Sequence, residues 1–183
     1  LYGSTILNTV TPDGKQLHVE QITNYPWSGD IEVAIRKAPS KSVAIRLRVP
    51  NWANKASFAI NGKQLTNVPV EHGYVTIAQN WKAGDKITIN FPIETTLMTA
   101  DPRVEETRNQ VAVMRGPVLY CLESPDLPSG YDVPSVFIPS NSTFKPVLGM
   151  SGINNEISNQ TFSLQGTGIF KQDALKAPLY RPF

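Results

Sequence analysis

Cys121, the single cysteine of the chain, is the first candidate for chemistry. It lies in the stretch VAVMRGPVLYCLES, two residues before Glu123. A reactive thiolate needs a neighbouring base or cation, and both histidines, His18 and His72, lie in the first half of the sequence. The run Val118–Leu122 is apolar on both faces, which is typical of a strand buried on both sides, where a free cysteine acts as a small hydrophobe. We therefore interpret Cys121 as a structural residue and predict no catalytic residue in this chain.

Paired carboxylates are the second kind of side chain that could do chemistry. A glycosidase needs two of them about 5 to 9 Å apart across the bond to be cleaved. The chain has 15 acidic residues, and no motif marks such a pair. Glu105 and Glu106 are neighbours on a polar connector, and we interpret them as solvated loop residues. The sequence has no histidine pair at helical spacing and no second cysteine, so it predicts no metal site and no cofactor in this chain.

Aromatic side chains remain as candidates for binding. Sugar rings stack on exposed faces of tryptophan and tyrosine, and binding residues are common on loops. The segment NYPWSGD places Tyr25 and Trp27 between two predicted strands, so both are candidate carbohydrate-binding residues. Trp52 and Trp81 lie near predicted strand ends, where we expect them to cover the core.

Charge and hydropathy exclude two classes of partner. The formal net charge is +2, from 17 basic and 15 acidic side chains without a basic run, so no nucleic-acid interface is predicted. No apolar stretch approaches the roughly 18 residues of a spanning helix, and LYGSTILNTV lacks the regions of a signal peptide. We therefore expect no membrane partner, and the sequence gives no prediction of the compartment.

Strands with a period of two must position these residues. The clearest is SVAIRLRVP, and the same alternation of apolar and polar residues runs through DIEVAIRK and DKITINFP. Asn61-Gly62 is typical of a two-residue hairpin turn, and Gly84-Asp85 marks a second turn. Strands that recur about every ten residues with short polar connections predict an all-β, antiparallel fold.

A polar segment divides the predicted strands into two groups. MTADPRVEETRNQ, residues 98–110, contains a proline and many charges, which is typical of a connector. We predict two antiparallel β-sandwich (jelly-roll-like) domains, residues 1–96 and 97–183, of which the second is rich in loops. Candidate strands in the second domain are QVAVM, PVLYCLE, NQTFSLQG and DALKAPLY.

Three ordered stretches carry a resemblance to a known family. LHVEQITNYPWSGDIEVAI, VAIRLRVPNWANKASFAINGK and the long segment from GYVTIAQNW to VAVMRGPVLYCLE resemble the region after the catalytic barrel in the bacterial β-L-arabinofuranosidase family, glycoside hydrolase family 127. The resemblance runs from Leu1 to about Ser124. From Pro125 to Phe183 it is thin, although ALKAPLYRPF is similar to a late strand of the family.

The resemblance implies that this chain is a C-terminal β-sandwich region without the catalytic (α/α)6 barrel. The family's catalytic cysteine, zinc ligands and acid/base glutamate belong to that barrel, so zinc is expected only there. Cys121 matches a cysteine in the family's GP-v-Y-C strand instead of the nucleophile.

Three roles follow as expectations. The first is a non-catalytic region that supports the barrel of the parent glycoside hydrolase and forms a homodimer interface. The second is a carbohydrate-binding module that holds a glycan on Tyr25 or Trp27. The third is an interaction surface, because sandwiches separated from a barrel would expose apolar area that is normally covered.

Overall fold

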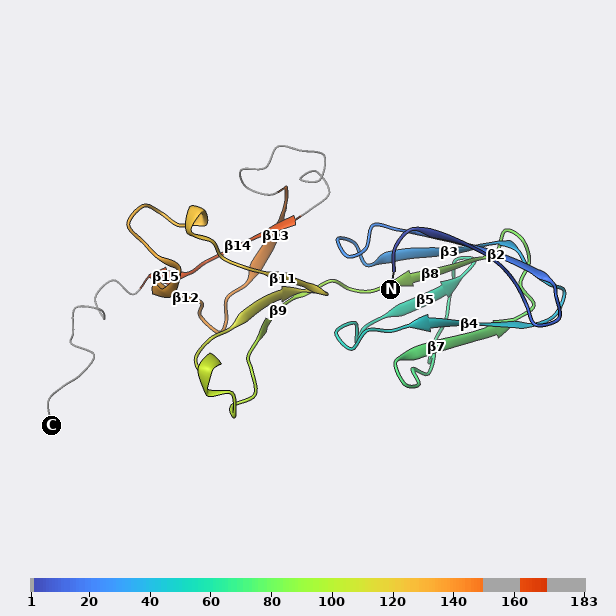
Figure 1. Cartoon of the computed structure of the whole chain (residues 1–183), viewed down its shortest axis with the longest axis horizontal. Coiled ribbons are helices and arrows are strands. Elements are labelled where there is room, and N and C mark those ends of the chain that lie inside the picture. The colour runs from blue at the N-terminus through green and yellow to red at the C-terminus, as the bar shows by residue number, and fades with distance from the viewer. Residues whose placement is uncertain (1, 150–161, 171–183) are drawn as a thin grey trace, which may run out of the picture. The chain divides into compact units, whose positions relative to one another are not determined.

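The computed structural model describes residues 2–149 and 162–170 (Figure 1). It divides into two compact units, Leu1–Glu94 and Thr95–Phe183. Strands and three short 3₁₀ turns make up the regular structure, and the described residues contain no α-helix. The predicted all-β fold is confirmed. The predicted strand DALKAPLY and the first three residues of NQTFSLQG lie outside the described residues.

The first unit is an antiparallel sandwich of a large and a small sheet. Its strands are β1 (Thr5–Val10), β2 (Gln16–Thr23), β3 (Asp30–Lys37), β4 (Val43–Arg48), β5 (Ser57–Ile60), β6 (Lys63–Gln64), β7 (Tyr74–Gln79) and β8 (Lys86–Asn90). The large sheet has the order β1-β2-β3-β8-β5-β6, and the small sheet consists of β4 and β7. Every pairing of neighbouring strands is antiparallel, as the short connections in the sequence predict.

The alternating strands enclose one hydrophobic core in this unit. β3 and β8 from the large sheet and β4 and β7 from the small sheet contribute most of it. Its fully buried side chains include Phe91, Ile31, Ile35, Ile87, Ile89 and Val75. The polar residues between them point away from the core because successive side chains of a strand alternate between its two faces.

The predicted Asn-Gly turn joins β5 to β6. Asn61 and Gly62 have φ angles of 49° and 79°, and Ile60 pairs with Lys63, so the loop has two residues. Positive φ at both central positions is the geometry that Asn-Gly adopts at low cost. The Asn61 side chain also donates to Asp85 Oδ1 at 2.9 Å and accepts from the Lys86 amide at 2.8 Å. This turn therefore ties the β5–β6 hairpin to the start of β8.

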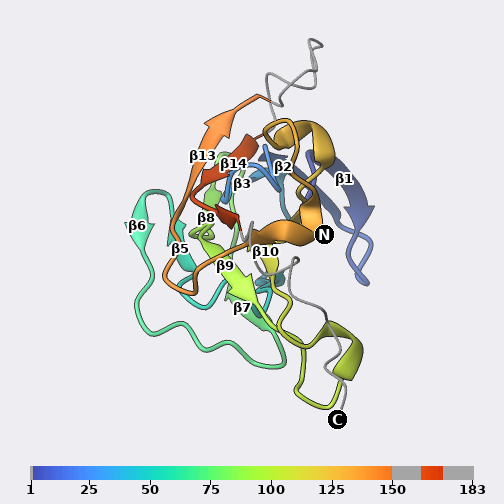
Figure 2. The ribbon, with the colours of Figure 1, turned by 90° about the vertical axis from the view of Figure 1, so that its left-hand side faces the viewer.

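The second unit consists of three small antiparallel sheets. Their strands are β9 (Thr95–Met98), β10 (Ala112–Arg115), β11 (Val118–Tyr120), β12 (Val136–Phe137), β13 (Phe144–Leu148), β14 (Phe162–Gly166) and β15 (Ile169–Phe170). The sheets have the orders β11-β10-β9, β12-β15 and β13-β14, and β13 and β14 lie side by side in both ribbon views (Figures 1 and 2). The 3₁₀ turns are η1 (Glu105–Thr107), η2 (Ser124–Asp126) and η3 (Val133–Ser135).

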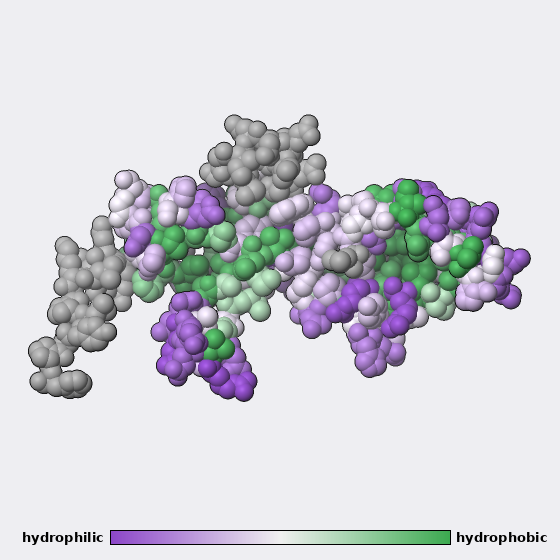
Figure 3. All heavy atoms as spheres, in the orientation of Figure 1, coloured by the Kyte–Doolittle hydropathy of each residue, from purple (hydrophilic) through white to green (hydrophobic). Residues whose placement is uncertain are grey.

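Apolar side chains in the second unit are less well covered than in the first. All buried hydrophobic residues in the described part of the chain lie between Tyr2 and Phe91. Fifteen large apolar side chains of the described residues are exposed, and ten of them belong to the second unit, among them Leu119 at 64% and Leu148 at 63%. Figure 3 shows hydrophobic residues, in green, on the surface of this unit. Exposed apolar area of this kind typically marks an interaction surface.

Candidate functional site

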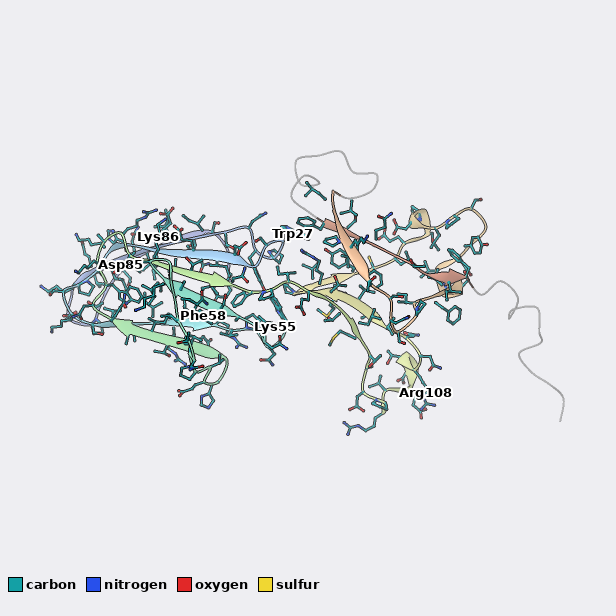
Figure 4. All side chains as sticks on the ribbon, turned by 180° about the vertical axis from the view of Figure 1, so that it is seen from behind. Trp27, Lys55, Phe58, Asp85, Lys86 and Arg108 are labelled. Atoms are coloured by element: carbon teal, nitrogen blue, oxygen red, sulfur yellow. The ribbon has the colours of Figure 1, made fainter. Side chains whose placement is uncertain are left out.

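The predicted binding residues Tyr25 and Trp27 lie in the loop that joins β2 to β3 (Trp27 is labelled in Figure 4). Thr23 Oγ1 accepts from the Tyr25 amide at 3.0 Å and donates to the Asp30 carbonyl oxygen at 2.8 Å. The amide of Trp27 donates to the Asn24 carbonyl oxygen at 2.9 Å, and the Tyr25–Pro26 peptide is cis. Backbone and threonine hydrogen bonds therefore hold the loop in one conformation.

Tyr25 belongs to a cluster of four aromatic rings. Its ring lies nearly parallel to that of Trp52, with the centroids 6.4 Å apart and an angle of 19° between the planes. Tyr2 meets Tyr25 edge-to-face at 6.0 Å and Phe91 at 5.4 Å, and Phe91 meets Trp52 at 5.9 Å. Such pairs contribute about 0.5–1.5 kcal/mol beyond the area they bury. The ring of Tyr25 is thus oriented by packing, and only part of it is exposed.

The two predicted binding residues are both half-buried. Neither is the fully exposed stacking platform that the loop position alone suggested. A half-exposed ring still presents surface to a ligand, and a ring that is already fixed loses little side-chain entropy on binding. The geometry is therefore compatible with a shallow sugar contact at Tyr25 and Trp27, and their binding role stays a prediction.

Trp81 is a core residue, whereas Trp52 belongs to the aromatic cluster around Tyr25. Trp81 is 3% exposed, and its indole Nε1 donates to the Val43 carbonyl oxygen at 2.8 Å, so it covers the core as expected. Trp52 is half-buried and stacks near Tyr25. The contact between Trp52 and Tyr25 was not predicted from the sequence. Tyr25 follows β2 and Trp52 follows β4, and no local signal shows that these two connections meet.

Tyr2 anchors the aromatic cluster to β4. Its hydroxyl donates to the Arg48 carbonyl oxygen at 2.6 Å, and burial raises the pKa of Tyr2 to about 12. Burial also raises the pKa of Tyr25. The environment of both phenols therefore disfavours the tyrosinate.

Tyr2 is expected to make the chain less stable as the pH rises above 10. Below pH 10 the phenol is neutral in both states; above it the unfolded chain loses the proton, while the folded chain keeps it up to about pH 12. Because the unfolded state then binds fewer protons, stability falls through this window, by at most about 3 kcal/mol. Urea unfolding between pH 9 and 12 should show a shallower decline for Tyr2→Phe than for the unmodified chain. Parallel declines would contradict the assignment.

Cys121 is exposed, which corrects the expectation that it fills a buried strand. β11 ends at Tyr120, so Cys121 follows the strand, and its neighbour Leu122 is also exposed. An apolar run is buried on both faces only where layers cover both faces, and the described part of the second unit does not cover this one. The Cys121 thiol donates toward Glu123 Oε1 at 4.0 Å.

Acidic side chains do not gather into a metal site in the part of the chain that the structure describes. Glu105 lies in η1 with Glu106, and it forms an exposed ion pair with Arg108 at 3.3 Å. Across residues 2–149 and 162–170, no group of three His, Cys, Asp or Glu side chains is arranged to hold a metal ion. None of the helical segments described is long and apolar enough to cross a membrane.

Comparison with known proteins identifies both units. Residues 1–93 match the family model described as the middle domain of glycoside hydrolase family 127, β-L-arabinofuranosidase. Residues 95–176 match the C-terminal domain of the same family. A non-reducing end β-L-arabinofuranosidase of Bifidobacterium longum subsp. longum is 36% identical over 118 residues, which cover 61% of this chain and 18% of the relative.

Solved structures agree with these matches. A structure described as a glycoside hydrolase superposes with a TM-score of 0.87 at 31% identity, over 100% of this chain and 30% of the other. A family 127 β-L-arabinofuranosidase from Geobacillus stearothermophilus T6 gives a TM-score of 0.78 at 29% identity, over 100% and 28%. This chain thus spans less than a third of the length of these relatives. Both halves of the chain match family 127 domains, and the chain belongs to glycoside hydrolase family 127.

Proposed function

We propose that this chain is the non-catalytic accessory region of a longer glycoside hydrolase, and that it supports a catalytic barrel elsewhere in that protein. The observation that carries the proposal is the match of both halves to the middle and C-terminal domains of the family. The relatives are more than three times as long, which leaves ample polypeptide for a catalytic domain.

The relatives support a substrate class for the proposed parent. The curated relative acts at non-reducing ends as a β-L-arabinofuranosidase, and the Geobacillus protein is described as an enzyme of the same specificity. These two descriptions support the inference that the parent hydrolase acts on terminal β-L-arabinofuranosyl residues of glycans. The 183-residue chain contributes structure to that reaction and no reacting group.

The chain alone is expected not to hydrolyse arabinofuranosides. Release of p-nitrophenol from p-nitrophenyl β-L-arabinofuranoside should stay at the rate without protein, both for the unmodified chain and for Cys121→Ala. The Bifidobacterium longum relative serves as the positive control. Turnover by the chain that disappears in Cys121→Ala would contradict the proposal, because it would place a nucleophile in this region.

We further propose that this chain forms a homodimer through exposed apolar side chains of the second unit. Its exposed apolar residues include Leu119 on β11, a strand at the edge of its sheet, and Leu148 on β13. A second copy that covers such residues removes apolar area from water, at about 25 cal/mol per Å². Most homo-oligomers are dimers in which the same surface patch of both copies meets around a two-fold axis. A single apolar patch on the second unit is therefore enough to form a dimer interface.

Light scattering tests the dimer directly. In size-exclusion chromatography with light-scattering detection, the unmodified chain should have twice the monomer mass of 20.2 kDa. Leu119→Lys should shift the population to monomer, because it places a charge in the interface. Val70→Lys is the matched control, since Val70 is an exposed apolar residue of the first unit. A monomer at all concentrations, or equal effects of the two variants, would speak against this interface.

Carbohydrate binding is the second candidate function, favoured by the half-exposed rings of Tyr25 and Trp27 in one ordered loop. Titration with arabinan-type oligosaccharides should quench tryptophan fluorescence, and Trp27→Ala should weaken binding about fivefold, since stacking on one ring contributes about 1 kcal/mol. Leu119→Lys, in the other unit, is the control. A flat titration at millimolar sugar would remove this function.

A further inference from the structure

Strand β1 is the longest strand of the first unit in which every residue is exposed. All six of its residues are exposed, and they include Ile6 at 65%, Leu7 at 52% and Val10 at 62%. Only two other large apolar side chains of this unit are exposed among the described residues, and one of them, Ile22, lies on the neighbouring strand β2. The exposed apolar area of the first unit is thus concentrated on one hairpin.

Leu7 continues the hydrophobic core beyond the region that the small sheet covers. It pairs with Val19 of β2, which in turn pairs with Ile35 of β3. Directly paired residues point to the same face of a sheet, so these three side chains form one row on the inner face. Ile35 is fully buried and Val19 packs against the core, whereas Leu7 is half exposed. Leu7, at the end of this row, is left uncovered because the large sheet has six strands and the small sheet that packs on it has only two.

The outer edge of β1 also lacks the features that normally prevent pairing with another chain. Its sequence, TILNTV, has no charged residue and no proline, although edge strands are usually protected by charge, proline, bulges or short length. The opposite edge of the same sheet is protected, since β6 has only two residues and one of them is Lys63. The β6 edge of the large sheet is therefore protected against pairing with another strand, and the β1 edge is not.

We propose that β1, with Ile6, Leu7 and Val10, is the surface on which the remaining polypeptide of the parent hydrolase docks. The inference rests on the proposed function, and it names the contact that joins this region to the rest of the protein. Relatives carry at least 70% of their length outside the part that matches this chain. Polypeptide joined to Leu1 enters four residues before β1 begins at Thr5, and such a short tether gives it a high effective concentration at this strand.

The chemistry of the surface defines the segment that fits it. An apolar side chain placed over Leu7 would extend the core row, and others would cover Ile6 and Val10 on the opposite face. The edge of the strand offers backbone hydrogen-bonding groups to the same segment. The absence of charge on β1 favours an uncharged partner, because burying an unpaired charge there would be costly.

Hydrogen exchange on the intact hydrolase and on the 183-residue chain tests this contact. The amides of β1 should exchange at least about tenfold more slowly in the intact protein, because docking suppresses local opening of the edge strand. The loop between β6 and β7, in which residues 66–67 and 69–72 are exposed, is the internal control and should exchange equally in both proteins. Equal exchange of β1 in the two proteins, with protection elsewhere in the first unit, would overturn the inference and leave the accessory role intact.

The other outcomes separate the remaining explanations. If no segment of the first unit is protected in the intact protein, the accessory role fails together with the inference. If β1 in the isolated chain becomes protected as the protein concentration rises, a second copy occupies the strand, and the inference is wrong. Each result therefore identifies which statement fails.

A pair of variants distinguishes docking from a structural role of β1 within its own unit. Leu7→Lys should lower the thermal midpoint of the intact hydrolase clearly more than that of the isolated chain, because half of the Leu7 side chain is already exposed there. Val70→Lys, at another exposed apolar position of the unit, should change neither. If Leu7→Lys destabilises both proteins equally, Leu7 acts within the sandwich and the inference is overturned.

Discussion

Trp81→Ala is expected to lower the free energy of unfolding of the first unit by about 3–5 kcal/mol. Trp81 is almost completely buried in the core, and its Nε1 donates to the Val43 carbonyl oxygen at 2.8 Å. The substitution removes the ring, leaves a cavity and deprives that carbonyl of its donor. A domain of this size has a total stability of roughly 5–15 kcal/mol, so the variant loses a large fraction of it.

Urea unfolding followed by far-ultraviolet circular dichroism measures this loss. Trp52→Ala is the matched control, because it removes the same side chain from a half-buried position and is expected to cost less. Tryptophan fluorescence provides a second probe, since all three tryptophans lie in the first unit and report on it alone. Equal costs at the two positions would contradict the assignment of Trp81 to the core.

Gly29→Ala is expected to cost about 3 kcal/mol or more, the upper range for forcing an additional methyl group into a packed site. A Cβ atom at Gly29 would lie 1.8 Å from the Phe91 carbonyl oxygen and 2.7 Å from its carbonyl carbon. The Phe91 amide also donates to the Gly29 carbonyl oxygen at 3.0 Å, and its ring is buried in the core. The Phe91 backbone therefore has no free direction in which to move away.

The same change should also disturb the loop of Tyr25 and Trp27, which ends at Gly29. Gly3→Ala is the control, because a Cβ atom there meets no heavy atom within 4 Å. Urea unfolding should place the midpoint of Gly29→Ala well below that of Gly3→Ala, which should equal the unmodified chain. Wild-type stability of Gly29→Ala would contradict the close approach of the Phe91 carbonyl group to Gly29.

Local patterns predicted the first unit well. The alternation in DIEVAIRK and DKITINFP appears as β3 and β8, whose apolar residues are buried and whose polar residues are not. The Asn61-Gly62 turn has the two positive φ angles that its sequence demands. Both signals are carried by neighbouring residues, because side-chain alternation and turn geometry depend on the local backbone.

The burial of a strand could not be predicted from the sequence where it depends on whether another layer packs against that strand. The run around Cys121 is apolar on both faces, yet Leu119, Cys121 and Leu122 are exposed, because an apolar run is buried only where another layer covers it. The four-ring cluster is non-local for a similar reason. Its members, Tyr2 and Phe91 above all, are distant in sequence, and they meet through the arrangement of the two sheets.

The candidate site was predicted in part. The loop of Tyr25 and Trp27 was identified from its residue types, whereas the contact of Tyr25 with Trp52 was not, since it needs the connection after β4 to approach the loop after β2. The open edge at β1 was also missed. The sequence TILNTV shows no strict alternation, and only the sheet order makes this strand an edge.

Determining the coding sequence upstream of Leu1 tests the accessory role most directly. An in-frame segment with the helical pattern of a barrel, and with cysteine and glutamate residues able to bind zinc, is the predicted result. It would make this chain the supporting region of a hydrolase whose chemistry lies in that segment. A start codon directly before Leu1, or an upstream domain of another class, would contradict that role and leave carbohydrate binding by Tyr25 and Trp27 as the leading function.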